Sequence, residues 1–221
     1  MPLSVIVPVY NGAPWLAATL DSALAQSLPA DEIVIVDDGS TDASPDILRA
    51  FGDRLRVIRQ PNAGVAAARN AGLAQARGDL ICFLDQDDLW PADRNRLLVE
   101  ALAADPAADL AAGRVEILWE RAEPPTRPEE TDTLHRQTLL GSLCVRRSVF
   151  ERLGPLSTAV GYGDDLDFAM LRREAGLRTV MLDAVTLIYR IHDTNTSIDR
   201  EVSKDIILNV LQRSLRRRRG A

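Results

Sequence analysis

The first half of the sequence alternates short apolar runs with helical segments, and this alternation constrains the fold more than any other feature. Runs rich in Val, Ile and Leu, which are typical of strands, cover residues 3–9, 32–36, 55–59 and 80–84. Helical spacing of apolar residues predicts helices between them, at 13–26, 46–51 and 65–75. Strands and helices that alternate in this way imply a parallel sheet with right-handed crossovers. We therefore expect an α/β fold with a Rossmann-like, mostly parallel sheet flanked by helices.

The second half is less regular and predicts a smaller part with a mixed sheet. Helices are expected at 92–104, 146–153 and 164–174, and strands at 109–119, 139–145, 179–182 and 185–189. The charged, Pro-rich segment 120–136 indicates an exposed loop, and an amphipathic helix at 198–219 closes the chain. We expect one domain at 1–197, with halves 1–90 and 91–197, and an appended helix with a basic tail at 198–221.

Composition limits the classes of protein that fit. With 221 residues, 46% of them apolar, the chain can bury a substantial core, and disorder is excluded. The net charge of -6 argues against nucleic-acid binding by the whole chain. Five arginines crowd the last turns: Arg213, Arg216, Arg217, Arg218 and Arg219. This tail is a candidate for contact with anionic lipid, nucleic acid or an acidic partner, and a solvated helix end is the simpler interpretation.

The sequence shows no targeting pattern. Pro2, Pro8 and Asn11 interrupt the first apolar stretch, and no apolar run reaches the length of a membrane span. Cys82 and Cys144 lie in apolar runs without CxxC spacing, which indicates buried free thiols and a reducing compartment. We expect a cytoplasmic protein, with the basic tail as a candidate for peripheral contact at the inner membrane face.

Three carboxylates, Asp85, Asp87 and Asp88, follow the fourth predicted strand directly, with Gln86 between the first two. Open α/β sheets bind their ligands outside the carboxyl ends of the strands, where these side chains are expected. Because like charges this close repel one another, a divalent cation is the simplest partner that makes the arrangement favourable. Hard cations such as Mg²⁺ take oxygen ligands and often a substrate diphosphate as well. The motif predicts a metal-dependent site for a phosphorylated substrate.

A second pair of acids, Asp37 and Asp38, ends the second predicted strand and is expected at the same edge of the sheet. An acid in this position is well placed to accept hydrogen bonds from a ribose or a base edge. The alternative is that the pair only forms a turn and caps the helix that follows.

Three further features are candidates for the same site. Asp164, Asp165 and Asp167 open a predicted helix, whose positive amino end stabilises carboxylates. Asp165 is also a candidate general base, and two residues apart on a helix it cannot face the same way as Asp167. His192 follows a strand and is either a structural histidine or a metal ligand. Arg69 can pair with the acids or with a diphosphate.

These motifs, in this order, resemble the family 2 glycosyltransferases of the GT-A fold. The matching segments are 5–12, 35–42, 62–72, 78–88, 163–167 and 189–192, and the resemblance spans roughly residues 3–197. It implies inverting transfer of a sugar from a nucleotide-diphosphate sugar, with a UDP-sugar as the first candidate, to an acceptor hydroxyl. It also implies a divalent metal, Mn²⁺ or Mg²⁺. The acceptor stays open.

For the donor, the resemblance implies a set of nucleotide-sugar-binding residues near the strand exits. They are Pro8, Tyr10, Asp37, Asp38, Arg69, Asp85 and Gln86. The first four would surround the base, Arg69 would steady the nucleotide side, and Asp85 would meet the ribose and the metal.

For the reaction, the resemblance implies Asp165 as the catalytic base, with Trp90 and Asp164 on the acceptor side. The metal of this DXD motif would be held by Asp85, Asp87 and His192, with Asp88 as an alternative ligand. The family commonly has glutamate where this chain has Asp164, which makes an acceptor contact by Asp164 less secure.

Two other functions stay open. A sugar-phosphate nucleotidyltransferase shares a similar nucleotide-binding half, but it normally has a Gly-rich, basic loop after the first strand, and residues 10–15 contain no basic side chain. A noncatalytic nucleotide-sugar-binding protein would keep the fold without turnover. The intact acids Asp85, Asp87 and Asp165 argue against the second alternative.

Overall fold

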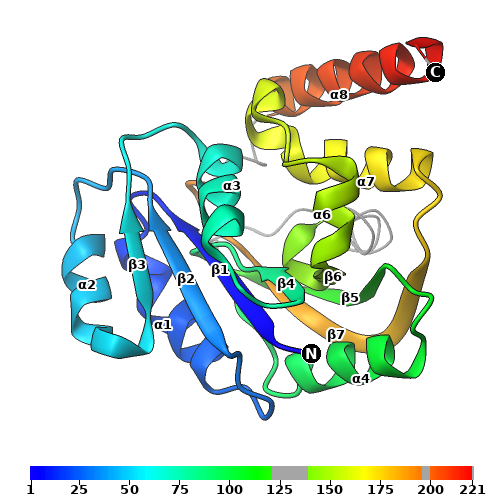
Figure 1. The fold of residues 1–221 in the computed structure, drawn as a ribbon. Coiled ribbons are helices and arrows are strands. Elements are labelled where there is room, and N and C mark those ends of the chain that lie inside the picture. Colours follow the sequence, from blue (N-terminus) through cyan, green and yellow to red (C-terminus); the bar gives the residue numbers. More distant parts are fainter. Residues whose placement is uncertain (121–138, 196–199, 221) are drawn as a thin grey trace.

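The computed structural model describes residues 1–120, 139–195 and 200–220, and within them seven strands form one sheet (Figure 1). The strands are β1 Leu3–Val9, β2 Glu32–Asp37, β3 Arg56–Arg59, β4 Leu80–Phe83, β5 Leu110–Trp119, β6 Leu143–Arg146 and β7 Thr179–Ile191. They lie in the order β3-β2-β1-β4-β6-β5-β7. The first four strands are parallel to one another, as the alternation predicts. β6 is antiparallel to both β4 and β5, and β5 is parallel to β7.

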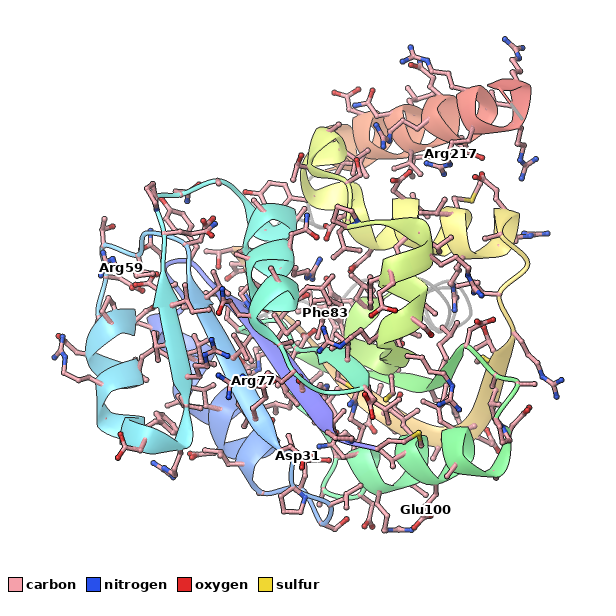
Figure 2. The ribbon with its side chains drawn as sticks, in the orientation of Figure 1. Asp31, Arg59, Arg77, Phe83, Glu100 and Arg217 are labelled. Atoms are coloured by element: carbon pink, nitrogen blue, oxygen red, sulfur yellow. The ribbon has the colours of Figure 1, made fainter. Side chains whose placement is uncertain are left out.

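Helices cover both faces of this sheet. They are α1 Ala13–Leu24, α2 Ser44–Phe51, α3 Val65–Gln75, α4 Arg94–Ala104, α6 Arg147–Leu153 and α7 Asp164–Glu174. Side chains of α1, α2 and α4 join one apolar cluster, and those of α3, α6 and α7 pack in another. β1 alternates between them, because Val5 and Val7 belong to the first cluster and Ile6 to the second. Figure 2 shows Phe83 of the second cluster near the centre of the molecule.

The predicted strand at 139–145 is wrong in its first half. A 3₁₀ turn, Leu140–Ser142, precedes the short strand β6. The hydroxyl and the main-chain N–H of Ser142 both donate to Leu139 O, at 2.8 and 3.2 Å. A chain that bonds back on itself in this way cannot extend, so apolar composition alone misplaces the start of the strand.

The two predicted strands at 179–182 and 185–189 are one strand, β7. Its register against β5 shifts around Gly113, where two extra residues of β7 bulge outward between Met181 and Val185. A Cβ on Gly113 would lie 2.5 Å from the carbonyl oxygen of Ala184, so the missing side chain lets the bulge approach β5. Asp183 at the bulge therefore interrupts the apolar pattern without ending the strand.

The last helix, α8 Arg200–Gly220, packs across α7 and the 3₁₀ turn Thr158–Gly163 at the edge of the molecule (Figure 1). Over residues 205–219, where the side chains are described, Val210 and Ser214 are buried, whereas the large exposed apolar side chains are Ile207, Leu208, Leu211 and Leu215. The amphipathic helix is confirmed, although residues 198–199 lie outside the described residues, as does most of the loop predicted at 120–136. Among the helices that the structure describes, none is long and apolar enough to cross a membrane.

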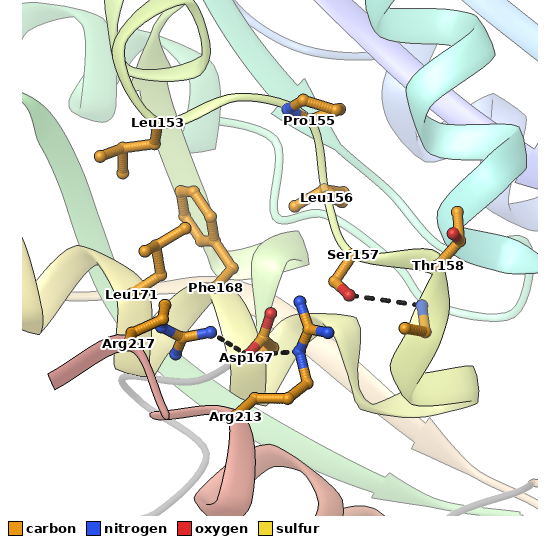
Figure 3. Close-up of a pocket in the computed structure, with 11 residues that line it drawn as sticks. Leu153, Pro155, Leu156, Ser157, Thr158, Asp167, Phe168, Leu171, Arg213 and Arg217 are labelled. Carbon is orange, nitrogen blue, oxygen red and sulfur yellow. Dashed lines mark hydrogen bonds and ion pairs between the residues drawn. The ribbon is translucent and has the colours of Figure 1, made fainter. Parts of the chain in front are cut away.

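Asp167 anchors α8 on α7. Its Oδ1 lies 2.7 Å from Arg217 Nη1 and 3.6 Å from Arg213 Nε. Figure 3 shows the three side chains together at the wall of a pocket of about 400 Å³, which Phe168 and Leu171 also line. Asp167 therefore contributes to tertiary structure.

Candidate active site

The carboxyl ends of β1, β2 and β4 lie at one edge of the sheet, and the loop 85–88 after β4 is fixed there. The Thr19 hydroxyl lies 2.8 Å from Gln86 O and 2.9 Å from Asp88 O. The Gln86 amide accepts from Tyr10 N at 2.8 Å and donates to Tyr10 O at 3.0 Å. Gln86 is therefore engaged with the main chain of β1, rather than open to a donor as the sequence suggested. The Tyr10 ring is 47% exposed and accessible to a ligand.

A bridge between the β4 loop and β7 brings Asp87 to His192. Leu89 N donates to Ile188 O at 3.0 Å, and Ile188 N donates to Leu89 O at 2.9 Å. Beyond this bridge, His192 Nε2 lies 3.1 Å from Asp87 Oδ2. The imidazole is buried and stacks on the ring of Trp15. The structure thus brings together two residues that the sequence singled out from opposite halves of the chain.

The Arg69 guanidinium gathers three carboxylates from both halves. Its Nη2 lies 2.5 Å from Asp85 Oδ1. Its Nη1 lies 2.6 Å from Asp164 Oδ2 and 3.1 Å from Asp165 Oδ1. The Arg69 side chain is only 3% exposed, and Arg69 and Asp165 are 96 residues apart in sequence. Arg69, expected to steady the nucleotide side, is turned toward the acids, which is the other partner that the sequence allowed.

Close packing of α3 against β1 positions Arg69. A Cβ on Gly72 would lie 2.4 Å from Ile6 Cγ2, so the absence of a side chain lets α3 approach the sheet. Arg69 lies three residues earlier, on the same face of the helix. Asp164 and Asp165 stand in the first turn of α7, where the positive end of the helix dipole favours carboxylates.

Burial controls the protonation of these acids. It raises the pKa of the Asp165 carboxyl to about 8; the Arg69 charge opposes this shift, and the charges of Asp164 and Asp85 add to it. Burial also raises the pKa of Asp85, again against the effect of Arg69. A carboxyl whose pKa lies near the working pH is suited to proton transfer. The electrostatics of Asp165 therefore fit a general base.

The donor set fits a divalent cation that is held in part by its substrate. Asp87 and His192 offer an oxygen and a nitrogen donor, whereas Asp85 is engaged by Arg69. Asp88, the alternative ligand, is buried and accepts a main-chain hydrogen bond from β7 at 3.0 Å. Within the described residues, no group of three acidic, His or Cys side chains is arranged so that it could hold a metal ion. Because Mg²⁺ is usually bound by one or two carboxylates plus substrate phosphates, a partial set of this kind is compatible with it.

Asp37 and Asp38 hold the turn after β2. Asp37 Oδ1 accepts from Ser40 N at 2.8 Å, and its Oδ2 lies 3.3 Å from Nη1 of Arg59, which Figure 2 labels at the periphery. Asp38 accepts from Gln60 Nε2 at 2.7 Å and from two main-chain N–H groups of residues 63 and 64. The turn interpretation explains these contacts, and they leave both acids at the edge where β1 ends.

Three residues with expected ligand contacts are buried instead. Pro8 lies within β1, which is buried along its whole length. Trp90 is 4% exposed; its Nε1 donates to Gly141 O at 3.1 Å, and the Arg94 guanidinium lies 3.7 Å from the ring centroid. Asp164 is covered by its ion pair. Trp90 and Asp164 are thus engaged in the protein interior, and their assignment to the acceptor side stays a prediction.

Sequence reasoning missed Trp15 and Thr194, which both contact His192. Trp15 counted only as an apolar position of a predicted helix, and Thr194 lies in a polar turn. A large aromatic residue in the first turn after a site strand is a signal that could have drawn attention to Trp15. No local pattern distinguishes Thr194 from other polar turn residues, because its role depends on which way the His192 ring points.

Residues 4–175 match the model of the family "Glycosyl transferase family 2". The "Uncharacterized glycosyltransferase EpsJ" of Bacillus subtilis (strain 168) is 32% identical over 208 residues, which cover 85% of this chain and 60% of that protein. The "Putative teichuronic acid biosynthesis glycosyltransferase TuaG" of the same organism is 43% identical over 96 residues, 42% of this chain and 38% of that protein. The chain thus spans less than two thirds of the length of these relatives.

Solved structures share the fold. S. aureus TarS 1-349 in complex with UDP has a TM-score of 0.72 and 22% identity, over 94% of this chain and 65% of that chain. The mannosyltransferase PcManGT from Pyrobaculum calidifontis, in complex with GDP-Man and Mn²⁺, has a TM-score of 0.71 and 27% identity, over 97% and 64%. The single mixed sheet flanked by helices is the expected GT-A fold. The sheet, the acids at its strand ends and the family match lead to one conclusion: this chain belongs to glycosyl transferase family 2.

Proposed function

We propose that this chain transfers a sugar from a nucleotide-diphosphate sugar to an acceptor hydroxyl, with inversion at the anomeric carbon and with a divalent metal. The observation that carries the proposal is the Arg69 cluster. It sets Asp165 of the second half beside Asp85 of the first half, at the sheet edge where ligands of open α/β folds bind. The donor class is supported by neighbours whose structures contain UDP, UDP-GlcNAc or GDP-Man with Mn²⁺.

The donor is proposed to bind along the exits of β1, β2 and β4. The exposed Tyr10 ring offers a surface for the base, and Asp37 and Asp38 form the adjoining wall. We take a UDP-sugar as the first candidate. Asp87 and His192 are the residues that would hold Mn²⁺ or Mg²⁺. A bound ion would offset the negative charge that builds on the departing diphosphate.

Asp165 is the proposed base. Its carboxylate takes the proton of the acceptor hydroxyl while that oxygen attacks the anomeric carbon from the face opposite the diphosphate. Arg69 orients this carboxylate through the 3.1 Å contact, and the raised pKa of about 8 makes the carboxylate a stronger proton acceptor than an ordinary aspartate. Base catalysis of this kind contributes about 10²–10⁴-fold to the rate.

The proposal is tested with the purified chain, a panel of UDP- and GDP-sugars, and Mn²⁺ or Mg²⁺. Release of nucleoside diphosphate reports turnover, and calorimetry reports donor binding. We expect Asp165→Asn to lose about 10²–10⁴-fold in turnover and to keep its donor affinity. Asp183→Asn is the matched control, because Asp183 is 94% exposed and pairs only loosely, at 3.6 Å, with Arg114.

Two outcomes would contradict the proposed reaction. An Asp165→Asn variant that turns over at the wild-type rate would remove Asp165 from the role of base. Donor binding by the wild-type chain without any turnover, across many acceptors, would favour the noncatalytic nucleotide-sugar-binding alternative.

We also propose that α8 rests on an anionic lipid surface. Its exposed aliphatic side chains share one stripe at helical spacing: Ile207, Leu208, Leu211 and Leu215. Arg218 and Arg219 lie exposed at the end of this stripe. An apolar stripe beside cationic side chains is typical of interfacial helices, whereas a second copy docked here would set arginines against arginines. The free, buried thiols of Cys82 and Cys144 fit a reducing cytoplasm, so the inner leaflet is the proposed surface.

This contact is tested by sedimentation with vesicles of phosphatidylcholine, with and without phosphatidylglycerol. Binding should require the anionic lipid and should fall in Arg218→Gln/Arg219→Gln and in Leu211→Ser/Leu215→Ser. Arg49→Gln, an exposed arginine of α2, is the charge control. Equal binding of both double variants and the wild type would reject the contact.

A further inference from the structure

His192 is held by Trp15, Thr194 and Asn195, which the proposed reaction does not use, and by Asp87, which it does. Trp15 stacks on one face, with ring centroids 3.7 Å apart and planes inclined by 14°. Thr194 Oγ1 lies 3.0 Å from Nδ1, and Asp87 Oδ2 lies 3.1 Å from Nε2. The side-chain amide of Asn195 accepts from His192 N and donates to a carbonyl of β7. The main chain, the ring plane and both ring nitrogens of His192 are thus all constrained.

We propose that Trp15 and Thr194 are positioning residues for His192. Trp15 fixes the plane of the imidazole, and Thr194 gives Nδ1 a hydrogen-bond partner that remains when the ring adopts the tautomer in which Nε2 presents a lone pair to a divalent cation beside Asp87. This inference deepens the proposed metal-dependent function and rests on it. It assigns a purpose to two side chains that the sequence did not single out.

The role of Thr194 follows from where the ring proton lies. Without a cation, Nε2–H can donate to Asp87 while Nδ1 accepts from the Thr194 hydroxyl. A ring nitrogen that binds a cation must be bare, so the proton then resides on Nδ1. Because a hydroxyl accepts as readily as it donates, Thr194 satisfies Nδ1 in both cases. One N–H bond breaks and another forms, so the ring stays neutral and no net proton is released.

The role of Trp15 follows from the direction of the lone pair, which lies in the plane of the imidazole. Rotation of the ring out of its observed plane would aim Nε2 away from Asp87. Trp15 belongs to α1, and Thr19 of the same helix contacts the loop that carries Asp87. One rigid helix therefore sets both the ring plane and the position of the carboxylate.

The experiment uses the intact chain labelled with ¹⁵N and ¹³C at histidine. His192 and His135 are the two histidines of the sequence, so one variant, His135→Gln, assigns both sets of imidazole signals. Mn²⁺ alone is the probe, and the measured quantity is the Mn²⁺ concentration that halves the His192 signal by paramagnetic broadening. The nitrogen shifts of the metal-free ring, recorded where imidazole is neutral, report its tautomer.

We expect Thr194→Val and Trp15→Leu to raise the Mn²⁺ concentration needed by about 10–100-fold, the usual effect of removing a group that orients a ligand. Thr194→Ser keeps the hydroxyl and Trp15→Phe keeps a stacking ring, so both should stay near the wild type. Thr194→Val should also shift the tautomer ratio of the metal-free ring, whereas Thr194→Ser should not. Circular dichroism checks that each variant is folded.

The outcomes distinguish failure of the metal assignment from failure of the positioning roles of Trp15 and Thr194. If Mn²⁺ broadens His135 and His192 equally in the wild type, the metal assignment of the proposed function fails. If His192 is broadened selectively, but Thr194→Val and Trp15→Leu respond at the wild-type Mn²⁺ concentration, the positioning roles are overturned and the metal assignment stands. If Thr194→Ser and Trp15→Phe need as much Mn²⁺ as Thr194→Val and Trp15→Leu, the inference is also overturned, because altered packing alone would then explain the weaker response to Mn²⁺.

Discussion

At the scale of single residues, one buried guanidinium, that of Arg69, compensates Asp85, Asp164 and Asp165. Removing one partner from a buried ion pair leaves the remaining charge out of water without compensation. We expect Arg69→Met to lower the free energy of unfolding by about 3–5 kcal/mol, measured by urea denaturation. Arg49→Met removes an exposed ion pair and should stay within about 0.5 kcal/mol.

A second substitution makes this test specific to charge. Asp164→Asn removes the most buried of the three carboxyls around this guanidinium, so it should restore part of the stability that Arg69→Met loses. If Arg69→Met costs no more than Arg49→Met, or if the double variant is as unstable as the sum of the two single variants, compensation of charge does not explain the cluster.

The positions of single site residues were predictable where their place in the sequence decides which edge of the sheet they reach. Acids directly after a strand must lie at the sheet edge, and the structure sets Asp87 against His192 and Asp165 beside Arg69 there. The direction in which a side chain points was not predictable. Trp90 also follows β4, but whether its ring faces solvent or the interior depends on Arg94 and Gly141, which meet it only in the folded chain.

At the scale of elements, the approach of α3 to β1 controls where Arg69 stands. A methyl group on Gly72 would meet Ile6 Cγ2 at 2.4 Å, so α3 would have to move away from the sheet. We expect Gly72→Ala to cost about 1–3 kcal/mol by overpacking, measured by urea denaturation, and to lower turnover as well. Ala74→Ser, on the exposed side of α3, should leave both quantities nearly unchanged. Normal turnover in a destabilised Gly72→Ala would show that the site tolerates a displaced α3.

The docking of α8 should depend on pH through Glu174. Burial opposes ionisation of this carboxyl, but hydrogen bonds from Arg217 and Ser214 bring its pKa below the ordinary value of 4.5. A lowered pKa stabilises the docked helix above the pKa of the undocked state, and the stabilisation is lost as pH falls through the lowered pKa. We expect the protection of α8 amides, which is their exchange rate relative to the intrinsic rate at the same pH, to fall as the pH falls below 4.5.

The matched variants for this prediction are Glu174→Gln and Glu100→Gln. Glu174→Gln should exchange faster at neutral pH and should show a smaller acid-dependent step, because its side chain does not titrate. Glu100→Gln changes an exposed carboxyl of α4 and should behave as the wild type does. An acid step that is the same in Glu174→Gln would assign it to another group.

The limits of the helices and strands of the first half were predictable because residues next to each limit determine it. The predicted limits 3–9 and 65–75 agree with β1 and α3, which an Asn-Gly turn and glycines bound. The predicted strand at 139–145 and the predicted break between residues 182 and 185 were wrong for a different reason. A 3₁₀ turn closed by Ser142 and a bulge accommodated by Gly113 are set by partners distant in sequence, so periodicity cannot show them.

At the scale of the whole molecule, UDP with Mn²⁺ should raise Tm, because a ligand that binds only the folded state stabilises it. At 100 times Kd the gain is about 2.7 kcal/mol, which corresponds to about 5–10 °C for a chain of this size. Asp87→Ala should lose the Mn²⁺-dependent part of the shift, and Asp21→Ala on the outside of α1 should not. An equal shift by UDP with and without Mn²⁺ would contradict a role for the metal in donor binding.

The overall architecture was predictable as a class, and its topology only in part. Alternation of strands and helices predicted the parallel pairing of β3, β2, β1 and β4. The insertion of β6 between β4 and β5, antiparallel to both, was not visible in the sequence. The pairing of β6 depends on tertiary packing between strands far apart in the chain, and local sequence patterns do not predict such pairing.

The ion-pair cluster around Arg69 also has a consequence for biosynthesis. During translation α3 leaves the ribosome well before α7, so a guanidinium destined for the interior waits with Asp85 as its partner while Asp164 and Asp165 are still to be made. In that interval the early half can form its strands, but Arg69 has one of the three carboxyl partners that surround it in the finished fold. The nascent chain is therefore expected to complete this cluster only when its late helix arrives.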